Sequence, residues 1–341
     1  MTAALASQTP PSLTVEALST ATGPVRRRLT ILEDVSFTVS PGEVIGIVGE
    51  SGSGKSMLAL TLMNLLPRSI VRTAGTVRLG DTVLTDLSGK AWRDRRGRDM
   101  AMIFQEPMTS LNPVMRIGQQ IEEVLVRRRR MSGRDANREA VRLLERVEIS
   151  SPAERLRAYP HELSGGMRQR VMIAIALAAN ARILIADEPT TALDVTIQAQ
   201  ILDLLRQLQA EMGMALILIT HDLGVVAEMA HRVMVLYAGR VAELAPVDSI
   251  FDDPRHPYTK ALLASIPTID SRRERLTTID GSVPTVGAMP SGCRFASRCP
   301  VARDVCKTLA PPVMPIAEDH GVACLEPFDY APPPVGLSGA A

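Results

Sequence analysis

The stretch "EVIGIVGESGSGKSMLALTLMNLL", residues 43–66, decides the fold of this chain. It joins a short apolar run, typical of a buried strand, to a glycine- and serine-rich loop and then to an apolar helical segment. The loop, "GESGSGKS", fits the pattern G-x-x-x-x-G-K-[ST] and stands where that pattern needs to be, between a strand and a helix. We therefore predict a phosphate-binding loop in an α/β fold rather than a chance turn.

This loop is suited to hold the phosphates of a nucleotide. Its glycines let the backbone N–H groups point inward, and the start of the helix adds partial positive charge. Lys55 is expected to reach the β- and γ-phosphates, and the Ser56 hydroxyl to ligate Mg²⁺. The predicted ATP-binding residues are Gly49, Glu50, Ser51, Gly52, Ser53, Gly54, Lys55 and Ser56.

A second apolar strand, "ARILIADEP", residues 181–189, ends in two carboxylates. Asp187 can hold Mg²⁺ through its water shell, and Glu188 then lies beside the γ-phosphate, where it can polarise an attacking water. The alternative is a strand whose last acid caps the next helix. The phosphate loop earlier in the chain favours the catalytic interpretation.

Elsewhere along the chain, segments with the sequence pattern of a β-strand alternate with segments that have the pattern of an α-helix. Strands are predicted in "LTVEAL", "ILEDVSFTV", "GTVRLGDTVL" and "MALILIT". Amphipathic helices are predicted from two apolar faces: Ala140, Leu143, Leu144 and Val147, then Ile197, Ile201, Leu204, Leu205 and Leu208. Buried strands between helices indicate a mostly parallel sheet covered on both faces. From about Pro254 proline becomes frequent, so we expect a domain boundary there.

Composition places the chain among ordinary globular proteins. Of its 341 residues 46% are hydrophobic, and the formal net charge of +1 implies no general attraction to nucleic acid. The start, "MTAALASQTPPSLT", lacks the features of a signal peptide, and the most apolar stretch, "VMIAIALAANARILIAD", is too short and interrupted to span a bilayer. We expect a cytosolic chain unless a partner holds it at a membrane.

Four arginines stand together at positions 127–130, within a charged and helical segment, residues 121–150. Such a run is usually the solvated face of a helix. Contact with lipid headgroups or with an acidic partner loop is the alternative.

Four further motifs identify a family resemblance. "IFQEP" (103–107) and "LSGGMRQR" (163–170) precede the second carboxylate strand, and "TALD" (191–194) and "ITHD" (219–222) follow it. In these motifs the chain resembles the ATPase subunits of ABC transporters. The resemblance implies a P-loop NTPase with a RecA-like α/β core and antiparallel β and α-helical subdomains, followed by a small C-terminal domain that contains the cysteines. The expected domains are residues 1–253 and 254–341.

The resemblance also implies roles for particular residues. Ser164, Gly165 and Gly166 open an apolar helix, whose N-terminus is a good anion site. In the family this signature closes on the ATP of the other subunit, which implies a head-to-tail dimer with two ATP molecules between subunits. The implied catalytic residues are Glu188, His221 and Gln105, the implied Mg²⁺ ligands are Ser56, Gln105 and Asp187, and Asp194 would organise the dimer seam. The alternative for His221 is a strand-end histidine satisfied by the backbone.

Longer stretches narrow the resemblance. "IFQEPMTSLNP", "SGGMRQRVMIA", "ADEPTTALDVT" and "HPYTKALL" resemble the ATPases of bacterial dipeptide, oligopeptide and nickel importers. This implies ATP hydrolysis at the cytoplasmic face of the membrane, with two permeases, a related second ATPase and an extracytoplasmic solute-binding protein as partners, and no nucleic acid. The alternatives are import of nickel or another small solute, a soluble ABC-class ATPase without permeases, and a module that binds ATP without hydrolysing it.

One departure from the family lies near the N-terminus. Members usually place an aromatic residue there to stack on adenine, but no aromatic residue occurs between Leu13 and Leu32, and residues 20–22 take that place. Arg26, Arg27 or Arg28 could substitute through a cation–π contact. Otherwise base selectivity is expected to be weak.

All four cysteines lie near the C-terminus: Cys293, Cys299, Cys306 and Cys324. Chance, disulfides, zinc and an iron–sulfur cluster are the alternatives. Disulfides suit the cytosol poorly, and zinc sites usually contain close Cys-x₂₋₄-Cys pairs, which are absent here. The importers that the chain resembles are associated with a C-terminal [4Fe–4S] site, whose charge Arg294, Arg298, Arg303 and Lys307 would offset. The expected role is structural, because the site would close a small proline-rich domain that lacks enough core of its own. Because the cysteines lie far along the sequence from the phosphate loop, we expect them to take no direct part in hydrolysis.

Overall fold

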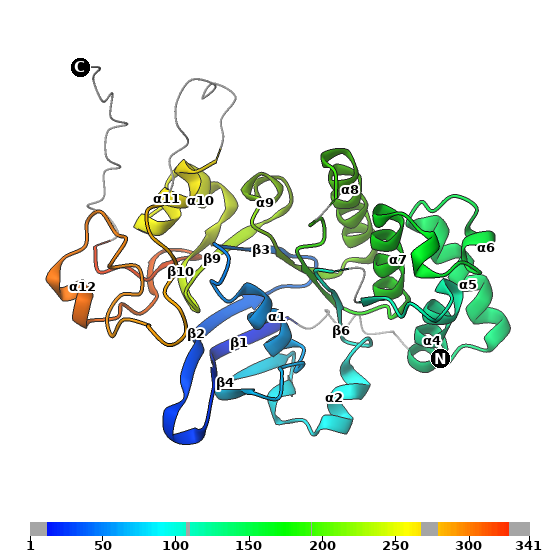
Figure 1. Cartoon of the computed structure of the whole chain (residues 1–341), viewed down its shortest axis with the longest axis horizontal. Helices are drawn as coiled ribbons and strands as arrows, with labels where there is room; N and C mark the ends of the chain where they lie inside the picture. The colour runs from blue at the N-terminus through cyan, green and yellow to red at the C-terminus, as the bar shows by residue number, and fades with distance from the viewer. Residues whose placement is uncertain (1–11, 107–109, 192, 267–278, 327–341) are drawn as a thin grey trace, which may run out of the picture.

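A computed structural model describes residues 12–106, 110–191, 193–266 and 279–326. The expected α/β P-loop fold is confirmed, with a large mixed sheet in the middle of the molecule, a small antiparallel sheet beside it and a helical lobe at one end (Figure 1). Most of the stretch that was inspected for a signal peptide lies outside the described residues. So do parts of "IFQEPMTSLNP", "TALD" and the expected C-terminal domain.

The small sheet has the order β2-β1-β4-β5, and all its pairs are antiparallel. Its strands are β1 (Leu13–Thr22), β2 (Leu29–Val39), β4 (Ile70–Leu79) and β5 (Thr82–Val83). Short helical turns border it: η1 (Val25–Arg27), η2 (Leu84–Asp86) and α2 (Gly89–Arg95). The strands predicted from "LTVEAL" and "ILEDVSFTV" are therefore confirmed, and both extend further than the sequence pattern indicated.

The large sheet has eight strands in the order β11-β12-β10-β9-β3-β8-β7-β6. They are β3 (Val44–Val48), β6 (Met100–Ile103), β7 (Ile183–Asp187), β8 (Ala215–Ile219), β9 (Arg232–Tyr237), β10 (Arg240–Pro246), β11 (Met314–Ala317) and β12 (His320–Val322). Strands β9, β3, β8, β7 and β6 are parallel, and every residue of β3, β7 and β8 is buried. Burial on both faces explains their continuous apolar sequences.

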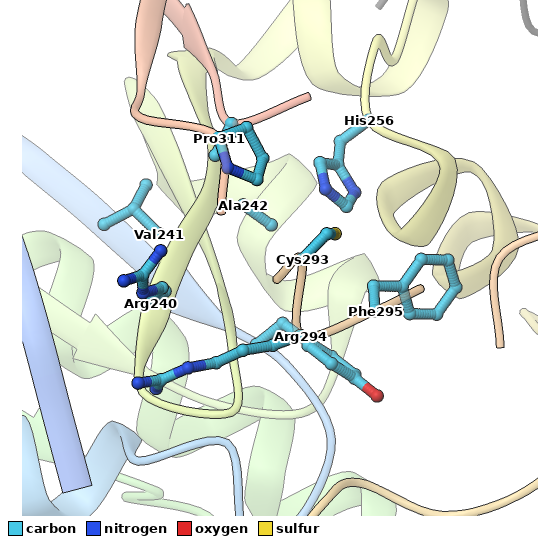
Figure 2. Close-up of a pocket in the computed structure, with 10 residues that line it drawn as sticks. Arg240, Val241, Ala242, His256, Cys293, Arg294, Phe295 and Pro311 are labelled. Carbon is cyan, nitrogen blue, oxygen red and sulfur yellow. The ribbon is translucent and has the colours of Figure 1, made fainter. Parts of the chain in front are cut away.

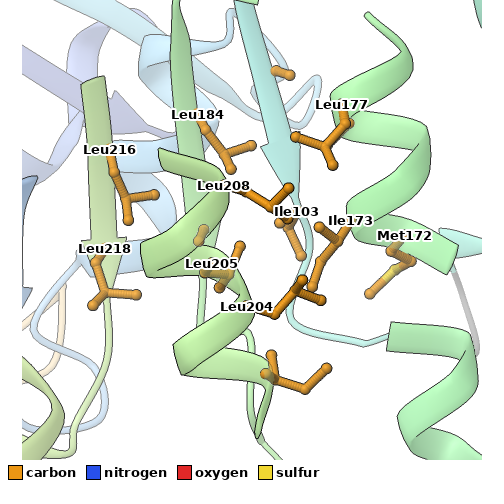
Figure 3. Close-up of a cluster of buried hydrophobic side chains, with 14 of the residues drawn as sticks. Ile103, Met172, Ile173, Leu177, Leu184, Leu204, Leu205, Leu208, Leu216 and Leu218 are labelled. Carbon is orange, nitrogen blue, oxygen red and sulfur yellow. The ribbon is translucent and has the colours of Figure 1, made fainter. Parts of the chain in front are cut away.

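Helices cover the two faces of this sheet. On one face, α7 (Gly165–Ala178) and α8 (Val195–Met212) pack their leucine and isoleucine side chains onto β6, β7 and β8 (Figure 3). On the other face, Leu58 and Leu62 of α1 (Lys55–Leu62) join a second core with Ile45 and Ile217. Each fully buried side chain of this size contributes about 1.5–3 kcal/mol. The helix starts that carry the motifs are thus fixed to a rigid sheet.

The helical lobe contains α4 (Ile117–Arg129), α5 (Gly133–Arg146), α6 (Pro152–Arg155), η3 (Pro160–Glu162) and α7. The predicted apolar face is confirmed, because Ala140, Leu143, Leu144 and Val147 are all buried. The charged segment is two helices rather than one. Arg130 ends α4 in the left-handed conformation, with a φ of 54°, and the Ser132 hydroxyl caps α5 by accepting from the Asp135 N–H at 3.2 Å.

In the arginine run, Arg127 pairs with Glu123 and Arg129 with Glu139. Their side chains stay substantially exposed, and they lie in the last turn of α4, where positive charge complements the helix dipole. These contacts are those expected of a solvated helix end, and the contact with lipid headgroups or an acidic partner loop stays an untested alternative. Within the described ranges, no helix combines the length and the hydropathy needed to cross a membrane.

The C-terminal part contains α9 (Leu223–Met229), α10 (Val247–Asp252), α11 (Pro257–Ala264) and α12 (Asp304–Thr308). Its strands β11 and β12 extend the large sheet, because β12 pairs with β10 at Glu243–Val322 and Leu244–Gly321. Residues on both sides of the expected boundary near Pro254 therefore share one sheet. The domain limits themselves stay a prediction.

Candidate functional site

Four motif segments meet at one edge of the large sheet. Strands β3, β8, β7 and β6 are parallel neighbours, so their carboxyl ends lie side by side. The phosphate loop follows β3, the "THD" segment follows β8, the two carboxylates end β7, and Gln105 follows β6. Ligands of open α/β sheets bind at such an edge. The sheet order thus explains why motifs more than a hundred residues apart form one site.

The phosphate loop depends on glycine where other residues would clash. At Gly49, with a φ of +151°, a Cβ atom would lie 2.2 Å from the carbonyl oxygen of Leu236. Gly54 occupies the N-cap of α1 with a φ of +105°, a conformation that side chains disfavour. The loop can therefore fold closely around an anion at the start of the helix.

Lys55 is buried, and its ammonium group lies against the loop backbone. Its Nζ donates to the carbonyl oxygen of Gly49 at 2.6 Å and to that of Glu50 at 3.1 Å. Burial lowers the pKa of Lys55, and the nearby carboxylates of Glu188 and Asp187 oppose that shift. The amine is thus poised inside the loop, next to the two acids.

Ser56 and Asp187 form the candidate magnesium centre. The Ser56 hydroxyl donates to Asp187 Oδ1 at 3.1 Å. Burial raises the pKa of Asp187, and the hydrogen bond from Ser56 partly offsets this. Hydroxyl and carboxylate oxygens are the donors that Mg²⁺ prefers, so these residues fit the ion that the sequence predicted.

Glu188 lies at the centre of a group of polar side chains. Its carboxylate accepts from Gln105 Nε2 at 2.9 Å and from the Thr191 hydroxyl at 2.8 Å, and it lies 3.4 Å from His221 Nδ1. Burial alone would raise the pKa of Glu188, but Thr191, His221 and the charge of Lys55 together hold it below its ordinary value. Glu188 is therefore an oriented carboxylate at neutral pH. The structure brings together the three predicted catalytic residues and adds Thr191, which the sequence reasoning did not single out.

The signature residues open α7 away from the core. Ser164 is the N-cap and accepts from the Met167 N–H at 3.3 Å, and both Ser164 and Gly165 are exposed. A Cβ atom on Gly166 would lie 2.9 Å from Ile197 of α8, so this glycine lets the two helices pack closely. Asp194 is also exposed, and it caps α8 by accepting from the Ile197 N–H at 3.0 Å. These residues are accessible to a partner surface.

In the expected adenine region, Thr20 is buried in β1, whereas Arg26, Arg27 and Arg28 are exposed around the turn between β1 and β2. Val25 in that turn is 78% exposed. The structure therefore leaves the arginines accessible and offers no aromatic ring from β1.

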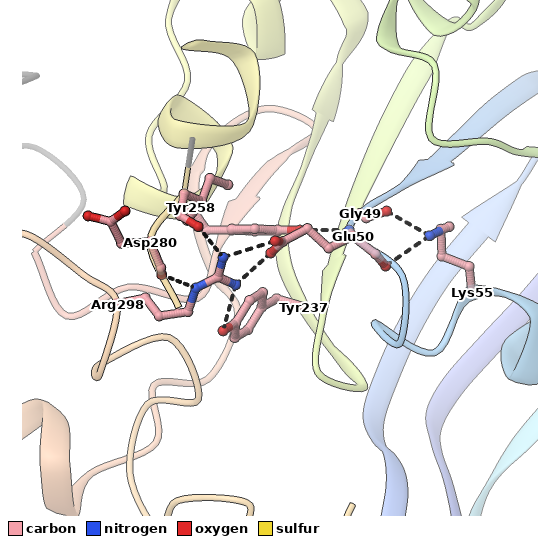
Figure 4. A network of polar contacts seen from close by, with 8 residues as sticks. Gly49, Glu50, Lys55, Tyr237, Tyr258, Asp280 and Arg298 are labelled. Atoms are coloured by element: carbon pink, nitrogen blue, oxygen red, sulfur yellow. Dashed lines mark hydrogen bonds and ion pairs between the residues drawn. The ribbon is translucent and has the colours of Figure 1, made fainter. Parts of the chain in front are cut away.

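Glu50 connects the phosphate loop to the C-terminal part of the chain (Figure 4). The Glu50 carboxylate accepts from Arg298 Nη1 at 2.6 Å and Nη2 at 2.9 Å, and the Glu50 N–H donates to the Tyr258 hydroxyl at 2.8 Å. The sequence placed Glu50 in the loop but gave no sign that its side chain turns toward Arg298. The sequence analysis did single out the arginines between the cysteines, but it assigned them to offsetting the charge of an iron–sulfur cluster.

Arg294, Arg298, Arg303 and Lys307 each have an acidic partner in the structure. Arg294 pairs with Glu33, Arg298 with Glu50, Arg303 with Glu326 and Lys307 with Asp304. Two of these contacts tie residues 292–306, hereafter the cysteine segment, to the ATPase core. The cysteine segment therefore contacts the phosphate loop although the two lie far apart along the sequence. The expectation that the cysteines take no direct part in hydrolysis stays a prediction.

The four cysteines are free thiols, and they lie near enough to one another to interact electrostatically. Burial raises the pKa of Cys299 and of Cys324 to about 11, and the pKa of Cys293 is also raised. At least one other thiol contributes to each of these shifts. Cys293 also faces a small cavity of about 30 Å³ beside His256 and Pro311 (Figure 2). Among the described residues, no three His, Cys, Asp or Glu side chains are arranged to hold a metal ion.

Two family descriptions match the sequence. The one described as "ABC transporter" matches residues 32–191, and the one described as "Oligopeptide/dipeptide transporter, C-terminal region" matches residues 242–306. A Brucella abortus (strain 2308) protein, provisionally named a peptide import ATP-binding protein, is 50% identical over 92% of this chain and 97% of its own length. The oligopeptide transport ATP-binding protein AppD of Bacillus subtilis (strain 168) is 51% identical over 86% of this chain and 90% of its own length.

Solved structures agree with the fold. A dimeric post-hydrolysis state of the ATP-binding cassette MJ0796, bound to ADP and phosphate, is 29% identical with a TM-score of 0.62, and the match covers 69% of this chain and 98% of that one. The cbiO1 protein of Clostridium perfringens, part of an ABC transporter complex, is 26% identical with a TM-score of 0.60, and the match covers 72% of this chain and 92% of that one.

Proposed function

This chain belongs to the ABC transporter family and is an ABC-type ATPase, and from that premise we propose that it drives peptide uptake through partner permeases. The observation that carries the proposal is the site at the carboxyl ends of β3, β6, β7 and β8, in direct contact with a C-terminal region of the oligopeptide/dipeptide transporter type. The names of its relatives support di- or oligopeptides as the cargo.

In the proposed reaction, the loop backbone of residues 49–56 and the Lys55 ammonium bind the β- and γ-phosphates of ATP. Lys55 exchanges its bonds to the Gly49 and Glu50 carbonyls for phosphate oxygens. Glu188 accepts a proton from the attacking water, Gln105 orients that water, and His221 contacts the γ-phosphate. The hydrogen bonds from Gln105 and Thr191 hold the Glu188 carboxylate in place for this step.

Ser56, Asp187 and Gln105 are the proposed magnesium ligands. The 3.1 Å contact between Ser56 and Asp187 places two of these oxygen donors together. When bound, Mg²⁺ neutralises charge on the β- and γ-phosphates.

The second half of each ATP site is proposed to come from a partner ATPase. Ser164, Gly165 and Gly166 would close on the ATP of the other subunit, and Asp194 would lie at the seam. The exposure of Ser164 and Asp194 supports this arrangement. Because the wording "GGMRQR" matches one of the two paired types of importer ATPase, we propose a heterodimer. A purified importer with two copies of this chain and no second ATPase would contradict the heterodimer.

The complex is proposed to contain two permeases and an extracytoplasmic solute-binding protein, with this chain held peripherally at the cytoplasmic face of the membrane. Nucleic acid is not among the proposed partners. The test is co-purification with the permeases, followed by reconstitution in liposomes with the solute-binding protein. We expect ATP-dependent uptake of a labelled dipeptide or oligopeptide. Uptake of nickel or another small solute alone would reassign the cargo, and ATP turnover without permease binding would favour a soluble ATPase.

The four cysteines are proposed to hold a [4Fe–4S] cluster, with zinc as the alternative. The donor set fits, because each iron of such a cluster takes one thiolate and the four thiols lie near enough to interact electrostatically. In the structure the sulfur atoms do not form a closed coordination shell. Because the pKa values of Cys293, Cys299 and Cys324 are raised, binding must be accompanied by loss of the protons on these thiols. The proposed role is structural.

Anaerobic purification tests this assignment. A cluster predicts brown protein with about four irons per chain. Colourless protein with one tightly bound zinc per chain would replace the cluster with the zinc site, and metal-free protein would contradict both.

A further inference from the structure

Glu50 is bonded in three directions at once. Its N–H donates to the Tyr258 hydroxyl, its carbonyl oxygen accepts from Lys55 Nζ, and its carboxylate accepts two hydrogen bonds from Arg298 (Figure 4). Lys55 is the residue proposed to grip the phosphates, and Arg298 belongs to the cysteine segment. A single residue of the phosphate loop therefore joins the nucleotide site to a segment that begins 242 residues later (292 minus 50).

Arg298 is well placed to couple movement of the phosphate loop to movement of the cysteine segment. Its side chain is 3% exposed. Besides the two bonds to Glu50, its guanidinium donates to the carbonyl oxygens of Ile279 and Asp280 and to the Tyr237 hydroxyl. A partly buried, bidentate ion pair has a defined geometry, and a planar guanidinium cannot follow a moving carboxylate without shifting its other partners.

Tyr258 provides a second attachment. Its ring packs in an aromatic cluster with Tyr237 and Phe295, at centroid distances of 4.5 and 5.3 Å. Phe295 lies in the cysteine segment, two residues after Cys293. The hydroxyl that receives the Glu50 N–H is thus anchored to the same segment as Arg298.

We propose that Arg298 and Tyr258 are positioning residues for the phosphate loop, and that through them nucleotide binding is coupled to the order of the cysteine segment. This inference rests on the proposed ATP site. To bind phosphate, Lys55 must give up its hydrogen bond to the Glu50 carbonyl oxygen. Glu50 is then held by its remaining bonds to Arg298 and Tyr258. Because coupling between two sites is reciprocal, nucleotide must stabilise the cysteine segment to the same extent that the segment favours nucleotide.

The first test measures binding of adenylyl imidodiphosphate, a non-hydrolysable ATP analogue, with Mg²⁺. Arg298→Gln removes the ion pair, and Tyr258→Phe removes only the hydroxyl and keeps the ring in its cluster. Arg303→Gln is the matched control, because Arg303 lies in the same segment and pairs with Glu326 instead of the loop. We expect Kd to rise about 5- to 20-fold for R298Q and about 2- to 5-fold for Y258F, with R303Q unchanged.

The second test needs no variant to detect the coupling. Hydrogen exchange of the full chain is measured for residues 293–298, where the Cys293 N–H donates to the carbonyl oxygen of Cys306 and the Arg298 N–H to that of Phe295. We expect the analogue to slow exchange at these amides at least about twofold in the wild-type and R303Q chains, and to have no such effect in R298Q.

These measurements separate positioning from simple stabilisation. If Arg298 only stabilises the fold, R298Q lowers the melting temperature but leaves Kd unchanged, and the inference is overturned. Unchanged exchange in wild-type chain that binds the analogue overturns it as well. Failure of the wild-type chain to bind the analogue would instead overturn the proposed ATP site, and the inference with it.

Discussion

The phosphate loop and the cysteine segment touch each other, yet different forces hold them in place. The loop is fixed by its neighbours in sequence: a buried strand before it, glycines within it and a helix after it. The cysteine segment contains part of one short helix, and it is held by ion pairs that span 248 residues, from Arg298 to Glu50, and 261 residues, from Arg294 to Glu33. A local motif can be recognised in any chain, whereas a contact of this kind exists only once the chain has folded.

The largest effect on ATP hydrolysis is expected from a substitution at Glu188, in the site that the sequence motifs form. Glu188→Gln keeps the size of the side chain but removes the base, so we predict retained ATP binding, a persistent dimer and hydrolysis reduced about 10²-fold or more. Steady-state turnover and nucleotide binding are the measurements. Glu228→Gln is the control, because that acid is exposed and pairs with Arg206 outside the site. Near-normal turnover of E188Q would remove Glu188 from the proposed role.

Lys55→Ala tests the phosphate-binding loop of the same site. It deletes the charge that faces the phosphates, so nucleotide binding itself should weaken about 10- to 100-fold, the range expected for a charge-assisted hydrogen bond. Titration with a fluorescent ATP analogue measures this. An unchanged Kd together with lost turnover would confine Lys55 to the chemical step.

Stability against pH tests the region held by long-range contacts. His256 is fully buried, and burial lowers its pKa from 6.5 to about 4. The unfolded chain therefore binds a proton between these values that the folded chain does not, and stability falls as the pH falls from 6.5 toward 4. We expect a loss of about 2 kcal/mol between pH 7 and pH 5, measured by chemical denaturation.

His256→Asn is the matched variant for this prediction. The His256 ring caps α11 by accepting from the Tyr258 N–H at 3.0 Å, and asparagine can cap a helix without titrating. The variant should lose this part of the pH dependence. The same slope in both chains would show that other groups cause it.

The smallest effect concerns selectivity for the adenine base of the nucleotide. Strand β1 offers no aromatic ring for a stacking contact, which is worth about 1–3 kcal/mol by analogy with base–aromatic contacts, and the exposed arginines 26–28 are the substitutes beside it. We expect ATP and GTP to support turnover within about tenfold of each other. A strong preference for ATP would point to selectivity from outside β1.

Sequence reasoning succeeded where the physics is local or periodic. The phosphate loop, the buried strand that ends in Asp187 and the apolar face of α5 could be predicted, and parallel strand order then brings Gln105, Glu188 and His221 together. The break between α4 and α5 was missed because it depends on one residue, Arg130, in the left-handed conformation. The contact between Glu50 and Arg298 was missed because neither position has a pattern that points to the other.

The pairing of β12 with β10 also has a consequence for synthesis. Strand β10 is synthesised long before β12, so a nascent or truncated chain that ends before residue 320 lacks the pairing partner of β10 at Glu243 and Leu244. An open edge of this kind is a template for pairing with another chain. The C-terminal strands therefore protect the edge of β10 once they have been synthesised. Chains cut near residue 253 are expected to aggregate even though every ATPase motif is present.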